Sequence, residues 1–346
     1  MKFLLHLDPL EVNQEMELHR SIVYQNIFDS LVSLGFEVKI YGRQVIKKTI
    51  TSCSSDNFIL STLPVYDYGY GVYNAEAQSN FVRNDVLTSA LNEYNSINFE
   101  PDVIITNTPS AVIRKRWPKC SILHYELSLF NRPPLPIFHQ FDPFGYYSKS
   151  LLSKFPAFKF SPNSNAVDYL ESLKFELFNI MSLGSSDLGS INAIYFPMPS
   201  DSTWAIKQEV GYKNRIQFLS ELSSKFASEK IITNEKPQSP LSNLERIEID
   251  KLPNVQIVEN ADMNGVGSML CAFCKATYTV SPSISLQTIF WGNKLLVHAD
   301  SSQYLWSLAD NKFALLASYV DKFAVRKFSD LPAKIDTLLE YNPYKL

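Results

Sequence analysis

Two acidic residues, which lie in different sequence contexts, are the best candidates in this sequence for nucleophilic or acid–base catalysis. Asp201 lies in "FPMPSDSTW", a loop of small residues and prolines that follows an apolar run. A carboxylate in a rigid loop can act as a nucleophile or a base, although aspartate also caps turns and helices. Glu126 lies in "HYELSLF", where apolar neighbours raise the pKa of a carboxyl group towards the range used in acid–base catalysis. Burying a carboxylate is costly, so we expect Glu126 to be functional.

A group of serines could bind an anion. Residues 278–297, "YTVSPSISLQTIFWGNKLLV", have the pattern of a strand, a serine loop, a helix and a second strand. Ser283 is expected to be the helix N-cap, which would turn the free N–H groups and the dipole of the helix towards a ligand. Such a helix end favours a phosphate, and Ser281 and Ser285 would add hydroxyl donors. The alternative is that Ser283 only caps its helix.

Lys236 lies in "KPQSP", residues 236–240, where the strand predicted within "EKIITNEKPQSP" ends. The two prolines stiffen the loop, so Lys236 would be held in place at small entropic cost. The alternative is a surface lysine beside a turn. Two such loops after neighbouring strands favour a binding site more than either loop does alone.

Several classes of function are disfavoured. Neither the G-x-G-x-x-G fingerprint nor a Walker A loop is present, which argues against dinucleotide-dependent and P-loop enzymes. The net charge of −3 provides no basic surface for nucleic acid. Cys271 and Cys274 have C-x-x-C spacing without two further nearby ligands, so we expect buried thiols in a helix and no metal site. No run approaches the roughly 20 apolar residues that span a bilayer, and His6, Asp8 and Pro9 interrupt the apolar start before a signal peptide could form. We therefore expect a cytoplasmic protein.

The elements that position these loops alternate between strand and helix. The first half begins with a strand at 2–7, a helix at 16–35 closed by Gly35, and a strand at 37–42. Further strands are expected within 101–110, 120–130, 190–204, 229–240 and 255–260. Further helices are expected within 161–190, 213–228 and 265–276. We expect an α/β protein of two doubly wound domains, 1–190 and 191–346, with the last helix able to pack back on the first domain. In such domains ligands bind outside the carboxyl ends of the strands, which is where the candidate residues lie.

Several of these stretches resemble one family of enzymes. "EKPQSP", "LPNVQIVEN" and "TYTVSPSISLQTIFWGNKLLV" resemble the C-terminal half of bacterial capsule and lipopolysaccharide transferases, which carry a K-P-H-P loop, an L-P-N-V segment and a strand–Ser-Ser–helix–Gly-Lys-Pro element. "YFPMPSDSTW" and "HYELSLFNRPPLPIFHQFDPFGYYSKS" resemble two further stretches of the same enzymes. These are GT-B glycosyltransferases, and the similarity is greatest to the retaining β-Kdo transferases that use CMP-Kdo. The resemblance covers residues 120 to 300.

The resemblance implies a fold and a set of roles. The fold would be GT-B, with two Rossmann-like domains facing a cleft, the first on the acceptor side and the second binding the donor. By position, Asp201 would attack the anomeric carbon and Glu126 would assist the acceptor. No metal or other cofactor would be needed, and the partners would be CMP-Kdo and a surface polysaccharide or lipid-linked glycan, with possible attachment to the inner membrane or to an assembly complex. The donor-binding residues would be Lys236, Gln238, Ser281, Ser283, Ser285 and Gln287, and the acceptor or cleft candidates would be Arg132, His139 and Asp142.

Two departures leave the donor open. Gln238 stands where the family usually has histidine, and Gln287 stands where the helix often carries glutamate. Both changes remove a titratable group from the donor site. Two alternatives follow: a GT-B transferase with another activated sugar, and a non-catalytic relative that binds glycan or nucleotide.

Overall fold

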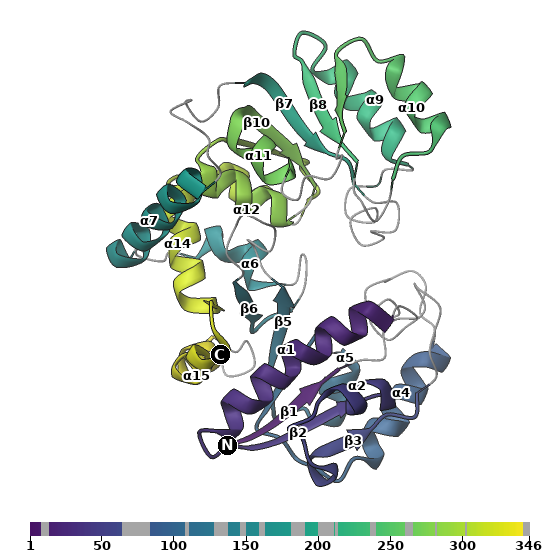
Figure 1. The fold of residues 1–346 in the computed structure, drawn as a ribbon, viewed down its shortest axis with the longest axis vertical. Helices are drawn as coiled ribbons and strands as arrows, with labels where there is room; N and C mark the ends of the chain where they lie inside the picture. The colour runs from purple at the N-terminus through teal and green to yellow at the C-terminus, as the bar shows by residue number, and fades with distance from the viewer. Residues whose placement is uncertain are drawn as a thin grey trace. The chain divides into compact units, whose positions relative to one another are not determined.

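The chain contains two compact units, each built on its own sheet (Figure 1). The computed structural model describes residues 1–7, 14–63, 84–107, 111–127, 138–145, 150–158, 163–180, 191–199, 211, 214–235, 240–259, 266–280, 282–301 and 303–341, without the side chains of 14–20, 84–86, 126, 127, 180 and 282. The first unit comprises Met1–Glu126, His139–Leu151 and Lys322–Leu346, and the second comprises Leu127–Phe138 and Leu152–Asp321.

The sheet of the first unit has the strand order β12-β6-β5-β4-β1-β2-β3. The strands β1 to β5 pair in parallel, whereas β12 runs antiparallel to β6 at the edge. Without β12 the order is that of a Rossmann domain, in which the chain first winds in one direction from β1 and then in the other. The strands are β1 (Lys2–His6), β2 (Glu37–Gly42), β3 (Phe58–Leu60), β4 (Val103–Thr106), β5 (Ser121–Leu127), β6 (His139–Asp142) and β12 (Ala324–Val325).

The first long helix shows how local sequence sets these elements. Helix α1 spans Gln14–Val32, and Gly35 follows it with a φ of 79°, a conformation that favours glycine. Ile27 and Leu31 of this helix are buried, but Ile22 is 53% exposed and Leu34 lies exposed beyond the helix end. The apolar residues of this segment therefore belong to the core only in part. The other helices here are α2 (Gln44–Thr49), η1 (Ser55–Asn57), α4 (Asn84–Ser96), α5 (Ala111–Arg116), η4 (Phe328–Asp330) and α15 (Leu331–Glu340).

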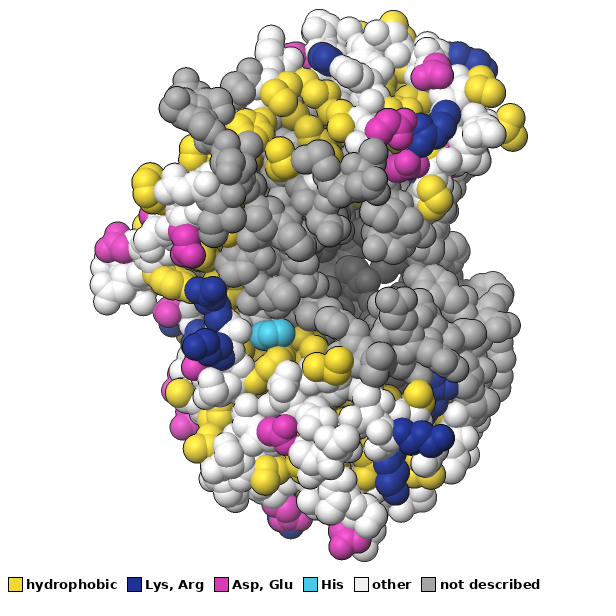
Figure 2. Space-filling model, in the orientation of Figure 1, with side chains coloured by type: hydrophobic (Ala, Val, Ile, Leu, Met, Phe, Trp, Pro, Cys, Tyr) yellow, Lys and Arg dark blue, Asp and Glu magenta, His cyan; other side chains and the backbone are white. Residues whose placement is uncertain are grey.

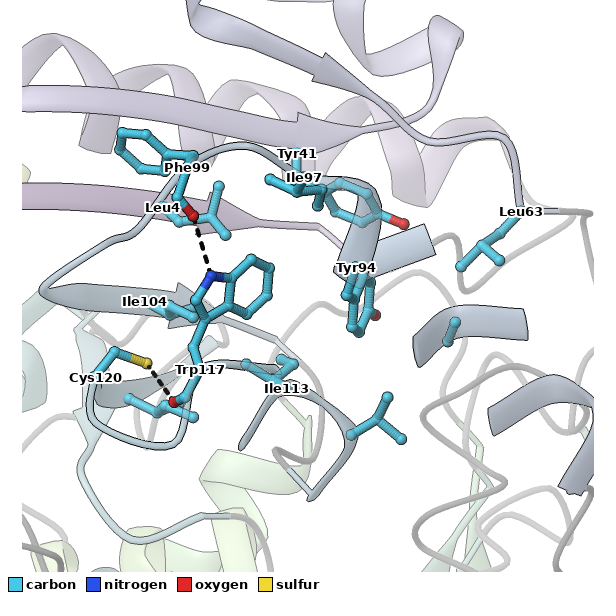
Figure 3. Packing of buried hydrophobic residues seen from close by; sticks show 13 residues of the cluster. Leu4, Tyr41, Leu63, Tyr94, Ile97, Phe99, Ile104, Ile113, Trp117 and Cys120 are labelled. Carbon is cyan, nitrogen blue, oxygen red and sulfur yellow. Dashed lines mark hydrogen bonds between the residues drawn. The ribbon is translucent and has the colours of Figure 1, made fainter. Parts of the chain in front are cut away.

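The core of the first unit is centred on Trp117 (Figure 3). Its indole N–H donates to the carbonyl of Phe99 at 3.0 Å, so the one polar atom of the ring is satisfied. The ring packs near Tyr94 of α4, with the centroids 5.9 Å apart. Helices α4 and α5 contact each other and, with buried residues of β1, β4 and β5, complete this cluster.

The sheet of the second unit has the order β11-β10-β7-β8-β9, with every pair parallel. This order repeats the first five strands of a Rossmann domain. The predicted fold class is thus confirmed: the protein is α/β, with two Rossmann-like doubly wound domains, the domain type of the GT-B enzymes. The strands are β7 (Ile191–Pro197), β8 (Ile231–Asn234), β9 (Val255–Val258), β10 (Cys274–Thr279) and β11 (Lys294–Val297).

One predicted helix is shorter than expected. Helix α11 ends at Phe273 and β10 begins at Cys274, so the expectation that both C-x-x-C thiols lie in a helix is wrong for Cys274. The segment "CKATYT" is rich in residues that favour strands, and it pairs with both β7 and β11. Cys271 and Cys274 are both buried and unbridged. The helices of this unit are α6 (Leu151–Lys154), η3 (Phe155–Ala157), α7 (Ser164–Ile180), α9 (Arg215–Lys225), α10 (Asn243–Asp250), α11 (Val266–Phe273), α12 (Pro282–Trp291), α13 (Tyr304–Leu308) and α14 (Lys312–Phe323).

The units do not divide at residue 190. The indole N–H of Trp306 donates to the carbonyl of Leu152 at 2.7 Å, and its ring stacks on Phe155 with the centroids 6.2 Å apart. Helix α7 also contacts α12, so residues 152–180 pack with the second unit. At the other end of the chain, β12 pairs with β6 and α15 contacts α1. No helix among the described residues is long and apolar enough to cross a membrane.

Candidate functional site

The carboxyl ends of β7 and β10 define the candidate site. These strands are parallel neighbours, with Ala276 beside Ile194 and Thr277 beside Tyr195. Strands β8 and β9 lie on one side of this pair and β11 on the other, so the winding direction reverses here. Ligands of doubly wound sheets bind in the crevice outside such a reversal point. The segment with Asp201 follows β7 and Ser281 follows β10, and both residues lie outside the described part of the chain.

Helix α12 begins one residue after Ser281. Its first residue is Pro282, so the expectation that Ser283 is the N-cap is wrong. Proline suits the first helical position because the N–H group it lacks would have no partner within the helix. Ser283 is half-buried within the first turn, and Ser285 is fully buried. The N–H groups at the start of a helix are the part that could hold an anion.

Gln287 is a buried residue in the middle of α12. It is 1% exposed, and its Oε1 accepts a hydrogen bond from Ser268 Oγ of α11 at 2.8 Å. This bond joins two helices of the same unit. A donor contact by Gln287 remains a prediction, and in the structure its carbonyl oxygen already has a protein partner.

Lys236 and Gln238 lie in residues 236–239, outside the described residues, and the described residues Glu235 and Pro240 flank this loop. At its start, Glu235 Oε2 accepts the backbone N–H of Leu241 at 2.8 Å. At its end, the carbonyl of Pro240 accepts a hydrogen bond from Arg215 Nη2 at 2.9 Å. The residues that flank 236–239 are therefore held by two specific hydrogen bonds.

Arg215 itself is held by a carboxylate. It is 3% exposed, and its Nε and Nη2 donate to the two oxygens of Glu245 at 2.7 and 2.8 Å. The hydrogen bonds from Arg215 lower the pKa of Glu245 to about 2, so this carboxylate stays charged. Glu245 and Ser242 also form a capping box at the start of α10. The Ser-x-x-Glu spacing of that box is a sequence signal that predicts the start of this helix.

The carboxyl edge of the first sheet carries a row of buried polar side chains. Tyr41, His6, Thr106 and His124 occupy the same level of four neighbouring strands. His6 Nδ1 lies 3.1 Å from Thr106 Oγ1, and its Nε2 lies 2.9 Å from Tyr94 OH. Complete burial lowers the pKa of His6 to about 3, so this ring is neutral. Both ring nitrogens are used within the protein.

The acceptor-side candidates fall in the same unit. Asp142 is buried at the end of β6, where its Oδ1 accepts the backbone N–H groups of Phe144, Gly145 and Leu151 at 2.8 to 3.1 Å. This carboxylate organises the turn after β6. His139 is half-buried, and its Nδ1 lies 3.0 Å from Tyr125 OH. For both residues the structure shows packing and hydrogen-bonding partners, and acceptor binding stays a prediction.

Glu126 is the penultimate residue of β5. Its side chain and all of Arg132 lie outside the described residues, so their roles stay predictions.

The two buried histidines predict how stability depends on pH. Burial lowers the pKa of His124 to about 4, and its Nδ1–H donates to the Asp142 carbonyl at 3.1 Å. Between pH 6.5 and these values the unfolded chain binds two protons that the folded chain does not. The free energy of unfolding should therefore be greatest above pH 6.5. It should decrease as the pH drops, by up to about 2.7 kcal/mol per pH unit near pH 5. Urea unfolding from pH 7 to 4.5 measures the slope; a His6→Gln/His124→Gln variant with an equally steep slope would contradict this account.

Comparisons with known proteins concern the fold. No family model matches this chain. No curated protein sequence matches it. Among solved structures, it is similar to two KpsC structures from Thermosulfurimonas dismutans. The beta Kdo 2,7 transferase has a TM-score of 0.46 at 13% identity and covers 73% of this chain and 89% of its own. The beta Kdo 2,4 transferase has a TM-score of 0.44 at 12% identity and covers 63% and 79%.

A third similar structure is the UDP-GlcNAc 2-epimerase of Methanocaldococcus jannaschii in complex with UDP-GlcNAc and UDP. Its TM-score is 0.42 at 13% identity, over 97% of this chain and 99% of that one. The activities in these names belong to those proteins, and the likeness to this chain is one of fold.

Proposed function

We propose that this protein is a retaining glycosyltransferase that transfers Kdo from CMP-Kdo, in β linkage, to a bacterial surface polysaccharide or a lipid-linked glycan. One observation carries most of the proposal. Strands β7 and β10 are parallel neighbours at the reversal point of the second sheet, so the chain segments with Asp201 and Ser281 begin from adjacent strand ends. This adjacency supports a site in which Asp201 would supply a nucleophile and the start of α12 would bind an anion.

The reaction would proceed by two displacements. In the first, a carboxylate oxygen of Asp201 forms a bond to the anomeric carbon while the bond from that carbon to the phosphate oxygen breaks, and CMP leaves. In the second, the acceptor hydroxyl attacks from the opposite side, Glu126 takes its proton, and the Asp201 carboxylate is released. Two inversions give net retention, as in a retaining glycosidase with an alcohol in place of water.

The phosphate would be stabilised without a metal ion. The first turn of α12 supplies N–H groups and the positive end of the helix dipole, and Lys236 would supply a cation from the next strand end. Both act on the charge that develops as CMP leaves. A lipid-linked acceptor would place the enzyme at the cytoplasmic face of the inner membrane.

A nucleotide panel tests this assignment. CMP should raise the melting temperature, because a ligand that binds only the native state stabilises it by about 2.7 kcal/mol at 100 times its dissociation constant. Cytidine, which lacks the phosphate, should have little effect, and Lys236→Ala should weaken the response to CMP. Stabilisation by UDP alone would instead favour a transferase with another sugar donor. No response to CMP, UDP, GDP or their sugar conjugates would reject the proposal.

A further inference from the structure

We infer that Arg215, Glu235 and Arg246 are positioning residues that set where the loop of residues 236–239 is presented at the carboxyl edge of the second sheet. The inference rests on the proposed function, in which Lys236 of this loop contacts the donor phosphate. None of the three is proposed to touch the donor. Each acts on the described residues that bracket the loop.

Glu235 closes the base of the loop. Its Oε2 binds the N–H of Leu241 six residues later, while its Oε1 accepts a hydrogen bond from Arg246 Nη2 at 2.9 Å. The carboxylate is 15% exposed, so the surrounding water screens these contacts little. One side chain therefore joins the end of β8 to the residue at which the chain returns towards α10.

Arg246 extends this connection to the next strand. Its Nη1 donates to Glu259 Oε1 at 2.6 Å, and Glu259 directly follows β9. The guanidinium thus joins the carboxyl ends of β8 and β9 through Glu235 and Glu259. A planar fork of this kind fixes direction as well as distance. Figure 2 shows acidic and basic side chains next to one another over the region of α10.

Arg215 secures the far end of the loop. Its side chain comes from the first residue of α9 and reaches both Glu245 and the carbonyl of Pro240. Three elements, β8, α9 and α10, therefore converge on the two ends of a four-residue segment. Fixing the flanking residues limits the entropy that a segment between them would lose on binding a ligand, which is how anchoring increases affinity.

The charges of the network also suit an anion site. Glu235, Glu245 and Glu259 would together repel a phosphate at this edge, but each is engaged by an arginine. The arginines offset most of this negative charge without occupying the loop. Loss of one arginine would thus both loosen the loop and expose the ligand to an uncompensated carboxylate.

The test compares Glu235→Gln and Arg246→Gln with a control from the opposite edge. Glu229 and Lys275 form a 2.5 Å ion pair at the amino ends of β8 and β10 of the same sheet, and their side chains are 37% and 34% exposed. The control variant Glu229→Gln therefore removes one carboxylate at the edge opposite the loop. Hydrogen exchange of the peptide covering 235–242 reports on anchoring without any ligand. Titration calorimetry with CMP, or with UDP if only UDP stabilises the wild type, reports on positioning.

In Glu235→Gln and Arg246→Gln we expect hydrogen exchange in 235–242 to be about tenfold faster and nucleotide affinity to be about tenfold lower. This is the size of effect expected for a lost charge-assisted hydrogen bond. With an assayable acceptor, KM for the donor should rise while kcat changes little, which general destabilisation does not produce. Glu229→Gln should change neither exchange nor affinity. Unchanged exchange, or faster exchange with wild-type affinity, would overturn the inference. A wild type that binds neither nucleotide would instead remove the proposed donor site, and the positioning role with it.

Discussion

An Asp201→Asn variant should bind CMP as tightly as the wild type and transfer sugar at least ~10³-fold more slowly, a loss typical of removing a catalytic side chain. The amide has the shape of the carboxylate but lacks the negative charge that attacks the anomeric carbon. Because the first displacement fails, no CMP should be released from the donor. Ser202→Ala, in the same loop, should retain most of the activity.

Release of CMP from CMP-Kdo, followed by chromatography, measures this effect with and without an acceptor. Glu126→Gln separates the two half-reactions, because it should permit CMP release in the first turnover while slowing transfer to the acceptor. An Asp201→Asn variant with normal turnover would remove the nucleophile from the mechanism. Loss of CMP binding in Glu126→Gln would move Glu126 to the donor side.

A Trp306→Ala variant should lower the free energy of unfolding by about 4 kcal/mol, the largest stability effect that we expect from a single core substitution. Trp306 of α13 is fully buried, and its ring stacks on Phe155 of η3. The substitution leaves a large cavity and deprives the Leu152 carbonyl of its 2.7 Å hydrogen bond. Since this contact joins residues 152–157 to α13 within the second unit, its loss should also increase hydrogen exchange in residues 152–157.

Trp306→Phe is the matched variant. It retains most of the buried apolar surface and an aromatic ring that can face Phe155, while it removes the indole N–H and the second ring of the indole, so its cost should be about 1–2 kcal/mol. Urea denaturation and exchange of the peptide covering 150–158 measure both variants. If Trp306→Ala loosened only α13 and left 152–158 protected, the segment would not depend on the second unit as the packing indicates.

Much of the fold could be predicted because its signals are local. The apolar strand β1, the helix that ends before Gly35 and the strand β2 each depend on neighbouring residues. Strands β3 and β12, with three and two residues, are too short to carry a pattern. The pairing of β12 with β6 joins residues far apart in sequence, so local sequence patterns do not predict it.

The strands that precede the candidate loops were predictable from sequence, whereas the contacts of individual candidate residues were not. The rule that ligands lie beyond strand ends selected the loops after β7, β8 and β10 without any structure. Ser283 was misplaced because the proline before it, which often breaks a helix, here begins one. Contacts such as Ser268 to Gln287 and Arg215 to Glu245 join residues 19 and 30 positions apart, so only the fold reveals them.

The covalent intermediate is the most direct test of the central claim. Wild-type protein mixed with CMP-Kdo and no acceptor, quenched in acid and examined by intact-mass and peptide mass spectrometry, should carry one Kdo residue on the peptide that contains Asp201. Addition of acceptor should discharge it, Glu126→Gln should accumulate it, and Asp201→Asn should not form it. An adduct on a different residue, or sugar transfer by the wild type with no adduct at Asp201 under rapid quenching, would contradict the double-displacement account.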